Sequence, residues 1–389
     1  MSKPIITFED FIKRILKIVF WVLLILPLVG VPIYYALDAF FHFPIDLFAL
    51  ATVKPLDMLA LTITLLTTEP TRTLFALTVF PGFTFVAVYS TILMGWVERK
   101  FTAKIQLRTG PMYAGKFEGI LQNIADFFKL AFKEIIIPNG VDKATFVAIP
   151  FALMAVVGGL VALVPLSPTT YIANPTVGAV LVFAILGFTP LIVLLAGWAS
   201  NSKYPFLGGL RALHQLVAYE IPLILSLLGT VVMSGSLNLM NIVTAQNGLW
   251  YIVLQPLGAI VFFIGALAEL ERIPFDLPEA DSELVSGWMT EYTSMLFGTF
   301  QLANFSRMYI LAGLFTTFFL GGWLGPGPVP PEVWFILKTT IVMVFMMLPR
   351  SIMPRVRIDI LLRAGWVRLL ALSFANIFIT MLIVSLRVV

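Results

Sequence analysis

The sequence predicts an all-α protein, a polytopic bundle of about nine transmembrane helices with an amphipathic helix at the cytoplasmic surface. Three observations support this fold class. Of the 389 residues, 59% are hydrophobic and 12% are charged, and the mean hydropathy is +0.98. Soluble domains carry about 25% charged residues, so this chain has too few polar side chains to cover soluble domains. The class of protein that fits this composition is a helical membrane protein.

Apolar runs of about 20 residues mark the candidate transmembrane helices. They occur at 15–37, 73–96, 144–165, 178–198, 217–234, 250–268, 293–323, 333–349 and 366–387. The run 293–323 is too long for one straight span, so we expect it to begin as a surface or tilted segment. Lys54, Pro55 and Asp57 interrupt a further apolar stretch, 46–67, which we interpret as interfacial.

The positions of the 25 lysines and arginines predict the orientation of the chain. With the N-terminus in the cytoplasm, most of them fall on the cytoplasmic side, including Lys203 and Arg211 in the loop before 217–234. Only Lys54 and Arg72 fall in loops on the opposite side. This asymmetry follows the positive-inside rule and predicts a multi-pass protein of the cell membrane with a cytoplasmic N-terminus. Large partners are then expected on the cytoplasmic face.

The composition excludes several kinds of chemistry. The chain has no cysteine and only two histidines, His42 and His214. Disulfides, cysteine-held iron–sulfur clusters and cysteine nucleophiles are therefore excluded, and we expect no histidine-based metal site.

The loop from Glu98 to Lys143 contains a predicted amphipathic helix. Its apolar residues recur at helical spacing, at Phe117, Ile120, Leu121, Ile124, Phe127, Phe128 and Ala131. The opposite face is polar and carries Glu118, Gln122, Asn123, Asp126, Lys129 and Lys133. Such a helix either anchors the loop at the membrane surface or packs on a soluble partner. Upstream, Gly110 and Pro111 predict a tight turn beside Arg108.

A second loop, from Ala268 to Tyr292, is rich in carboxylates. Against the single base Arg272 it carries Glu269, Glu271, Asp276, Glu279, Asp281, Glu283 and Glu291. A solvated acidic loop is the ordinary explanation of such a run. Apolar residues alternate with these acids, however, so we expect a partly buried cluster whose raised pKa values suit proton exchange. Calcium binding is a weaker alternative, because the spacing matches no EF-hand.

Glu220 is the single acid in the apolar stretch VAYEIPLILSLLG. An intramembrane carboxylate indicates a functional site, and Pro222 is expected to distort the helix beside it. The alternative is a glutamate at the level of the lipid headgroups.

Four runs of the sequence resemble one known family. They are VERKFTAKIQLRTGPMYAGKFEGILQNIADFFKLAFKE, AGWASNSKYPFLGGLRALHQLVAYEIP, AELERIPFDLPEADSELVSGWMTEY and MPRVRIDILLRAGW. In this order and spacing they resemble the membrane-embedded H subunit of the proton-pumping NADH:quinone oxidoreductase (complex I), on which the hydrophilic redox arm docks. The resemblance makes 71–389 a membrane domain like that of the H subunit and leaves 1–70 as an N-terminal extension with one added transmembrane helix.

The resemblance implies roles for particular residues. To the wall of a quinone chamber, or to docking of the redox arm, it assigns Glu98, Arg99, Arg108, Gly110, Pro111, Gln122 and Asp126, with Arg272 and Asp276 holding the shape of the acidic loop. To proton or ion coupling it assigns Glu134, Glu220, Glu269, Glu279, Asp281, Glu283 and Glu291.

The resemblance also implies cofactors and partners. The chain is expected to have no catalytic residue and to bind no metal or cofactor of its own. A quinone would enter its cavity, and flavin, iron–sulfur or nickel–iron centres would belong to partner subunits. The expected partners are peripheral-arm subunits on the cytoplasmic face, antiporter-like and small membrane subunits, and the lipid bilayer, but no nucleic acid.

The sequence departs from the family pattern at a few positions. Met112 and Glu271 stand where the family usually has Asn, and Asn304 stands where it usually has Glu. These departures fit an alternative equally well, the same adaptor subunit in a membrane-bound hydrogenase or sulfane reductase complex that binds no quinone. The sequence fits an independent secondary transporter less well, because such transporters often contain internal repeats and this sequence shows none. A passive scaffold does not explain seven acids in one apolar loop.

Overall fold

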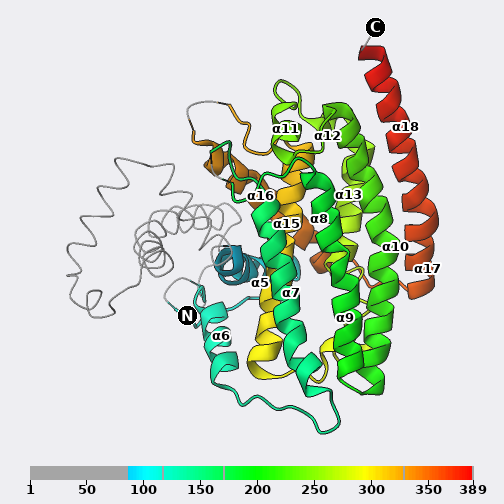
Figure 1. The fold of residues 1–389 in the computed structure, drawn as a ribbon. Helices are drawn as coiled ribbons and strands as arrows, with labels where there is room; N and C mark the ends of the chain where they lie inside the picture. The colour runs from blue at the N-terminus through cyan, green and yellow to red at the C-terminus, as the bar shows by residue number, and fades with distance from the viewer. Residues whose placement is uncertain (1–85, 116–117, 170, 327–328, 388–389) are drawn as a thin grey trace, which may run out of the picture. The chain divides into compact units, whose positions relative to one another are not determined.

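The computed structural model describes residues 86–115, 118–169, 171–326 and 329–387. The predicted extension 1–70, its span 15–37, the stretch 46–67 and most of the predicted span 73–96 lie outside these residues. All regular structure in the described part is helical, and no strand occurs there (Figure 1). The predicted all-α fold is therefore confirmed.

Five helices among the described residues are long and apolar enough to cross a membrane. They are α7 (Lys143–Leu163), the pair α8 (Gly178–Leu186) and α9 (Phe188–Ala199), α10 (Lys203–Ser234), α16 (Pro331–Ile352), and the continuous run of α17 (Ile358–Arg363), η3 (Ala364–Leu369) and α18 (Leu370–Arg387). The chain is therefore a membrane protein by these helices, whereas the full set of nine predicted spans is not confirmed.

Two predicted spans differ in detail from the structure. The run 250–268 forms two pieces, α12 (Tyr251–Leu254) and the 14-residue α13 (Pro256–Glu269), because Gln255 leaves the helical conformation and Pro256 starts a new helix. The run 293–323 forms a single helix of 26 residues, α15 (Ser294–Phe319), without a separate surface segment at its start.

The helix α10 starts well before the predicted span 217–234. It has 32 residues, so Lys203 and Arg211 lie on the helix and not in a loop as predicted. It ends at Gly235, which adopts the left-handed conformation (φ 66°) that favours glycine after a helix. Asn238 then caps the short α11 (Leu239–Thr244), because its side chain accepts hydrogen bonds from the backbone of Met240 and Asn241.

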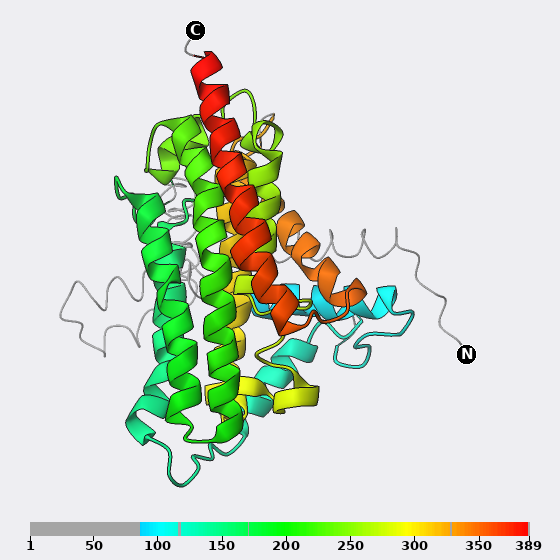
Figure 2. The same ribbon diagram turned by 90° about the vertical axis from the view of Figure 1, so that its right-hand side faces the viewer.

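Different short helices lie at the two ends of the bundle. The short helix α6 (Gln122–Phe132) and the connection between α9 and α10 lie at one end, and α11 and α12 lie at the other (Figure 1). We call these the α6 end and the α11 end. The N-terminal part of the described chain contains the π-helix η1 (Tyr89–Met94) and the helix α5 (Gly95–Ile105). In the turned view, α18 runs along α10 on the outside of the bundle (Figure 2).

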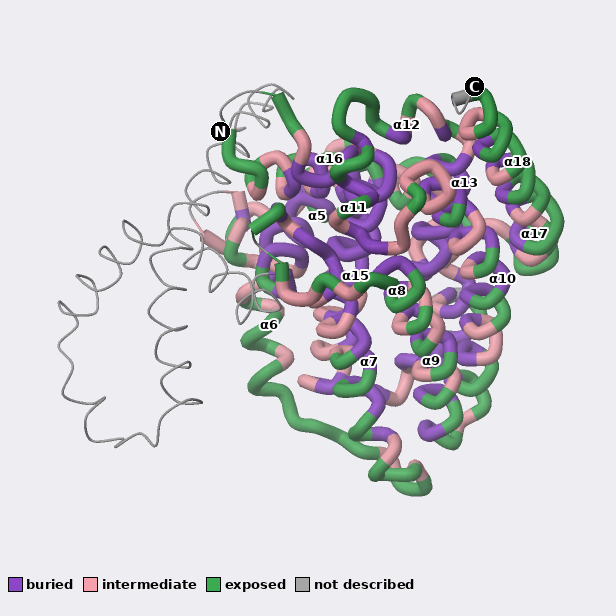
Figure 3. Tube along the Cα trace, turned by 45° about the horizontal axis from the view of Figure 1, so that its top comes forward, coloured by how far each residue is buried: buried purple, intermediate pink, exposed green. Residues whose placement is uncertain are grey.

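The helix α15 supplies the centre of the core. Every residue from Ser306 to Phe319 is buried, and the burial map shows the same concentration inside the bundle (Figure 3). Lys338 of α16 closes the α11 end of α15, because its Nζ donates to the carbonyl oxygens of Leu320 (2.6 Å) and Gly322 (3.1 Å). The ammonium also lies 4.2 Å from the centre of the Trp250 ring. The carbonyls at the C-cap of α15 and in the turn that follows it thus find a donor inside an apolar protein.

Candidate functional site

The acidic loop between α13 and α15 packs into the bundle. It contains α14 (Asp281–Leu284) and η2 (Gly287–Met289), and its Trp288 is fully buried. A Cβ on Gly208 of α10 would stand 2.6 Å from the Trp288 nitrogen, so only glycine allows η2 to approach α10 this closely. The loop is therefore packed against α10 and partly buried, as its alternation of acids and apolar residues predicted.

One buried carboxylate joins three parts of the chain. Glu98 of α5 accepts a hydrogen bond from Arg272 of the acidic loop at 2.7 Å and pairs with Arg350 of α16. Only 4% of the Glu98 side chain is exposed. Burial alone would raise the pKa of this carboxyl, but the charges and hydrogen bonds of the two arginines outweigh burial and lower the pKa. The two arginines therefore favour the ionised form of Glu98, which ties α5 to α16 and the loop.

Two further ion pairs hold the loop from outside. Asp276 accepts a hydrogen bond from Arg355 at 2.8 Å, and Glu283 pairs with Arg211 of α10. Half of the Glu283 side chain (53%) is exposed. Asp276 thus ties the acidic loop to the segment after α16, whereas Glu283 forms an ion pair at the surface.

A second buried pair lies deeper in the bundle. Arg307 of α15 donates from one guanidinium nitrogen to the carboxylate of Glu269 at 3.1 Å and to the Glu269 carbonyl oxygen. The two side chains are 1% and 3% exposed. Arg307 is the only cation that contacts the Glu269 carboxylate within the described residues.

Glu271 and Glu279 extend this cluster toward the α6 end. The Trp288 indole donates to one Glu271 oxygen at 3.3 Å. Burial is the main cause that raises the pKa of Glu271 to about 7. Burial and the negative charges of Glu271 and Asp276 raise the pKa of Glu279 well above its ordinary value. Both carboxyls therefore hold protons more tightly than an exposed glutamate does.

Glu220 lies on the other side of Glu269. Its carboxylate faces the junction of α8 and α9, where a Cβ on Gly187 would stand 3.0 Å from Glu220 Oε1. Glu220 and Glu269 are close enough to repel each other electrostatically, as are Glu269 and Glu271, and Glu271 and Glu279. Glu279 in turn interacts with Arg272 and Arg350. We call Glu220, Glu269, Glu271 and Glu279 the carboxylate row.

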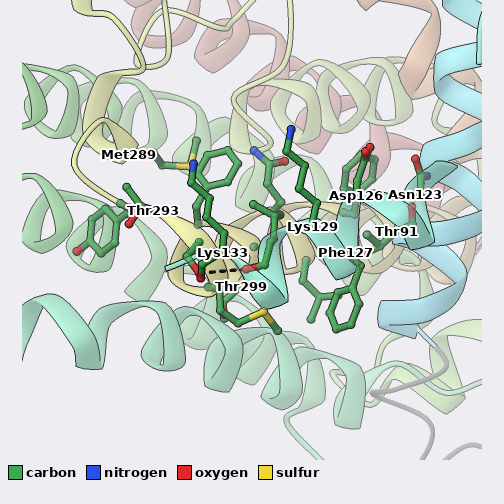
Figure 4. Close-up of a pocket in the computed structure, with 18 of the residues that line it drawn as sticks. Thr91, Asn123, Asp126, Phe127, Lys129, Lys133, Met289, Thr293 and Thr299 are labelled. Atoms are coloured by element: carbon green, nitrogen blue, oxygen red, sulfur yellow. Dashed lines mark hydrogen bonds between the residues drawn. The ribbon is translucent and has the colours of Figure 1, made fainter. Parts of the chain in front are cut away.

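A cavity of about 620 Å³ opens between α6, η1 and the start of α15 (Figure 4). Its apolar wall includes Phe127, Leu130, Met289, Met295, Phe297, Leu302 and Phe305, and its polar groups include Arg99, Asp126, Lys129, Lys133, Thr290, Thr293 and Thr299. Figure 4 shows Lys129 and Lys133 extending along the cavity from α6, with Met289 and Thr293 of the acidic loop on the side of Lys133. Its size and mixed lining suit a small organic ligand with a polar head.

Asn123 binds α6 to the π-helix η1. Its side-chain amide donates to the carbonyl oxygens of Thr91 (2.8 Å) and Ile92 (3.0 Å) in η1. The amphipathic pattern placed Asn123 on the solvent face, but it is the most buried residue of α6. Carbonyl groups available on the π-helix explain this difference, because they need donors in a buried setting.

Two of the predicted residues, Arg99 and Asp126, line the cavity. Arg99 pairs with Asp126 at 2.6 Å, and Gln122 donates to the same carboxylate at 3.0 Å. The turn at Gly110 and Pro111 packs on Gly119. A Cβ added to Gly119 would stand 2.6 Å from the Pro111 carbonyl. Arg108 is exposed and bonds to Gln106.

The remaining coupling candidates do not join the carboxylate row. Glu134 is exposed beyond α6, and Glu291 is partly buried beside the cavity wall. The side chain of Asp281 lies outside the described part of the structure. Among the described residues, no group of three or more Asp, Glu or His side chains forms a metal site, so the calcium alternative finds no support there.

Sequence analysis left some of the site residues without a role. Glu271 was identified as an acid of the loop and as a departure from the family pattern, but it received no site role, and neither did Arg307, Arg350 and Asn123. Arg307 could have been found from the sequence, because it is a lone arginine inside a long apolar run. A cation buried there needs a buried anion as its partner.

The geometry defines a class of protein, a helical membrane protein with a cavity and a row of carboxylates that share one packed loop. Comparison with known proteins agrees with this class. The family model for NADH dehydrogenase matches residues 78–381. The NADH-quinone oxidoreductase H subunit of Dehalococcoides mccartyi is 43% identical over 298 residues, which cover 77% of this chain and 83% of that protein. The corresponding H subunit of Bacillus thuringiensis is 44% identical over 292 residues, 74% of this chain and 88% of that protein. The chain belongs to the NADH dehydrogenase family, among its H subunits.

Proposed function

We propose that this chain is the membrane subunit of a multisubunit NADH-quinone oxidoreductase that couples electron transfer in a peripheral arm to ion movement in the membrane. Its own residues supply no redox centre. Their part is to form the cavity wall, to hold the docking face and to carry charge through the carboxylate row. The relatives are named as subunits of NADH-quinone oxidoreductase, which supports membership in such a complex.

One observation carries this proposal. The acidic loop contributes Ser286, Met289, Thr290, Tyr292 and Thr293 to the cavity, and the same loop contains Glu271 and Glu279 of the carboxylate row. A change of charge in the cavity would therefore act on carboxylates that lie on the same fixed segment. Electrostatic interactions in such a buried setting are stronger than in water.

The cavity fits a quinone. Its volume lies in the range of small-molecule sites, about 300–1,000 Å³, and its aromatic and thioether side chains suit a ring with an apolar tail. Lys129, Lys133 and the threonine hydroxyls offer donors for quinone oxygens. A bound quinone would accept electrons from the peripheral arm, and this chain would bind and orient it.

The α6 end has the features of a docking face. Large apolar side chains are strongly exposed there, including Leu107 (96%), Tyr113 (100%) and Phe132 (86%). Arg99 and Arg108 lie among them, and both are exposed. Exposed apolar patches with a charged rim are typical of protein–protein contacts. We assign this face to the peripheral arm, and with the positive-inside asymmetry it is the cytoplasmic face.

A photoreactive quinone analogue on the purified complex tests this function. We expect labelled peptides from α6 and from the start of α15, with protection by excess quinone. Gly298→Phe should abolish labelling, because a Cβ on Gly298 already meets Leu130 at 3.4 Å and a phenyl ring would fill the cavity. Ala371→Phe, which adds the same ring on the exposed side of α18, is the matched control.

The outcome also separates the two forms of the proposal. A complex that transfers electrons, shows no labelling here and ignores competing quinone would be of the hydrogenase or sulfane reductase type. In that case the cavity would have another role, and the quinone part of the proposal would be wrong.

A further inference from the structure

A cluster of uncharged polar side chains lies inside the bundle, away from the carboxylate row. Gln255, at the break between α12 and α13, and Asn376 and Thr380 of α18 meet at Gly229 of α10. A Cβ on Gly229 would stand 2.7 Å from Asn376 Nδ2, 3.0 Å from Gln255 Oε1 and 3.3 Å from Thr380 Oγ1. We call these three side chains the amide cluster.

The amide cluster is buried and incompletely bonded. Gln255 and Asn376 are each 2% exposed, and Thr380 is fully buried. Neither polar atom of the Gln255 amide, nor Asn376 Nδ2, has a hydrogen-bond partner among the residues that the structure describes. Unpaired amides are costly inside a membrane protein, where bulk water cannot reach them. Their convergence on one point indicates a ligand.

The chemistry of the cluster selects the ligand. It offers an acceptor, Gln255 Oε1, and two donors, Gln255 Nε2 and Asn376 Nδ2, so the ligand must both donate and accept hydrogen bonds. No carboxylate takes part, and the inward amide hydrogens would repel a cation. We propose that a buried water molecule, bound by Gln255 and Asn376, joins the start of α13 to α18 beside Gly229 of α10. Buried waters typically have two to four polar partners.

Glycine lets the Asn376 amide approach α10 and α13 closely on two sides. Besides Gly229, a Cβ on Gly258 of α13 would stand 2.8 Å from Asn376 Nδ2 and 3.0 Å from its Oδ1. The site is separate from the carboxylate row, because Glu220 lies nine residues before Gly229. At about 100° per residue this places the two on opposite faces of α10.

The water site has a structural consequence for α18. This helix lies on the outside of the bundle, and Phe374, Phe378 and Leu382 on its outer side are exposed. Lipid tails are as apolar as these side chains, so hydrophobic burial gives α18 little reason to stay on α10 and α13. Hydrogen bonds through the water supply a specific contact that fixes its position.

Electron cryo-microscopy of the intact complex, at a resolution that shows ordered water, tests the site directly. We expect a density peak within hydrogen-bond distance of both the Gln255 and the Asn376 amides. Gly229→Ala should remove this peak, because its methyl group would stand 2.7 Å from Asn376 Nδ2 and would push this amide out of place. A direct Gln255–Asn376 hydrogen bond without intervening density, or a lipid tail in the site, would overturn the proposal.

The melting temperature of the complex tests the role of the water. Asn376→Leu should lower it by several degrees, because Gln255 is then left with fewer partners. Ser385→Ala is the control, since it removes an exposed hydroxyl from the same helix and should change nothing. Equal melting temperatures for Asn376→Leu and Ser385→Ala would contradict the fastening role.

Discussion

The Arg307 guanidinium spans the gap between two helices and holds both the side-chain carboxylate and the backbone carbonyl of Glu269. Arg307 lies at the start of the fully buried half of α15, and Glu269 is the last residue of α13. One side chain therefore neutralises a buried charge and satisfies a carbonyl at a helix end. This contact fixes where the carboxylate row passes through the bundle.

Removing Arg307 should therefore destabilise the protein strongly. Arg307→Met leaves the Glu269 carboxylate buried without its cation, and breaking a buried ion pair typically costs about 3–5 kcal/mol. We expect a clear fall in the melting temperature of the purified complex. Arg307→Lys keeps the charge and should lose less, although a lysine cannot reproduce both contacts as well.

A double variant identifies the cause of this loss. Arg307→Met with Glu269→Leu replaces both charges by apolar groups, and such replacements are often neutral. The double variant should be more stable than Arg307→Met alone. If it is equally unstable, then packing of the arginine stem and not the unpaired charge accounts for the effect.

Glu271 should make stability depend on pH. Its pKa rises from 4.5 to about 7 in the folded protein, mainly through burial. Between these values the folded protein holds a proton that the unfolded chain has released, so stability falls as pH rises through this window. At about 1.36 kcal/mol per pKa unit, the free energy of unfolding falls by about 3 kcal/mol across this window. Glu271→Gln should remove this part of the dependence.

Melting temperatures between about pH 5 and pH 8 check this expectation. The curve of Glu271→Gln should be flatter than that of the wild type, and Glu283→Gln, at a surface ion pair, should follow the wild type. Parallel curves for the wild type and Glu271→Gln would show that the buried carboxyl does not titrate in this range.

Local patterns predicted much of this fold. Apolar runs located α7, the α8–α9 pair, α16 and α18, and helical spacing located α6 within a few residues. Alternating acids and apolar residues predicted that the acidic loop is packed. In each of these cases the information lies within about 20 consecutive residues, which is the length that such patterns describe.

Long-range partners could not be predicted in this way. Arg307 and Glu269 are 38 positions apart, and Glu98 and Arg350 are 252 apart. Asn123 looked solvated because a helical pattern does not show that a neighbouring π-helix presents carbonyl groups. The resemblance assigned Glu283 to coupling, and the apolar run 217–234 carries no signal for the early start of α10, which brings Arg211 beside Glu283.

The contact between Asn123 and η1 should control the mobility of α6. Asn123→Ala removes two hydrogen bonds to η1 and leaves the Thr91 and Ile92 carbonyls with fewer donors. Each such loss typically costs about 1–3 kcal/mol. We expect faster backbone hydrogen exchange in α6 of the intact complex. Phe132→Ala, at an exposed side chain of the same helix, should leave exchange unchanged, and equal rates in all three proteins would contradict the fastening role of Asn123.

The predicted orientation can be tested without background, because the chain has no cysteine. Tyr113→Cys, at the α6 end, should react with a membrane-impermeant maleimide only after the cells are opened. Asn247→Cys, in the exposed connection between α11 and α12, should react in intact cells. The physical reason is that basic residues gather on the side that carries Tyr113. The opposite labelling pattern would invert the proposed topology and move the docking face outside.

The carboxylate row should be needed for ion movement more than for electron transfer. Glu269→Gln keeps the volume and the hydrogen-bonding capacity of the side chain but removes its charge, and a group that relays charge must change its protonation state or its charge interactions. We expect an assembled complex whose clusters are still reduced, with most of the electron-transfer-driven membrane potential lost. Glu220→Gln should behave in the same way, because its carboxylate interacts with Glu269. Asp359→Asn, at a mostly exposed surface pair with Arg357, is the matched control and should retain the wild-type ratio of ions to electrons. If Glu269→Gln and Glu220→Gln also retain that ratio in proteoliposomes, the row only holds the bundle together, and coupling must follow another path.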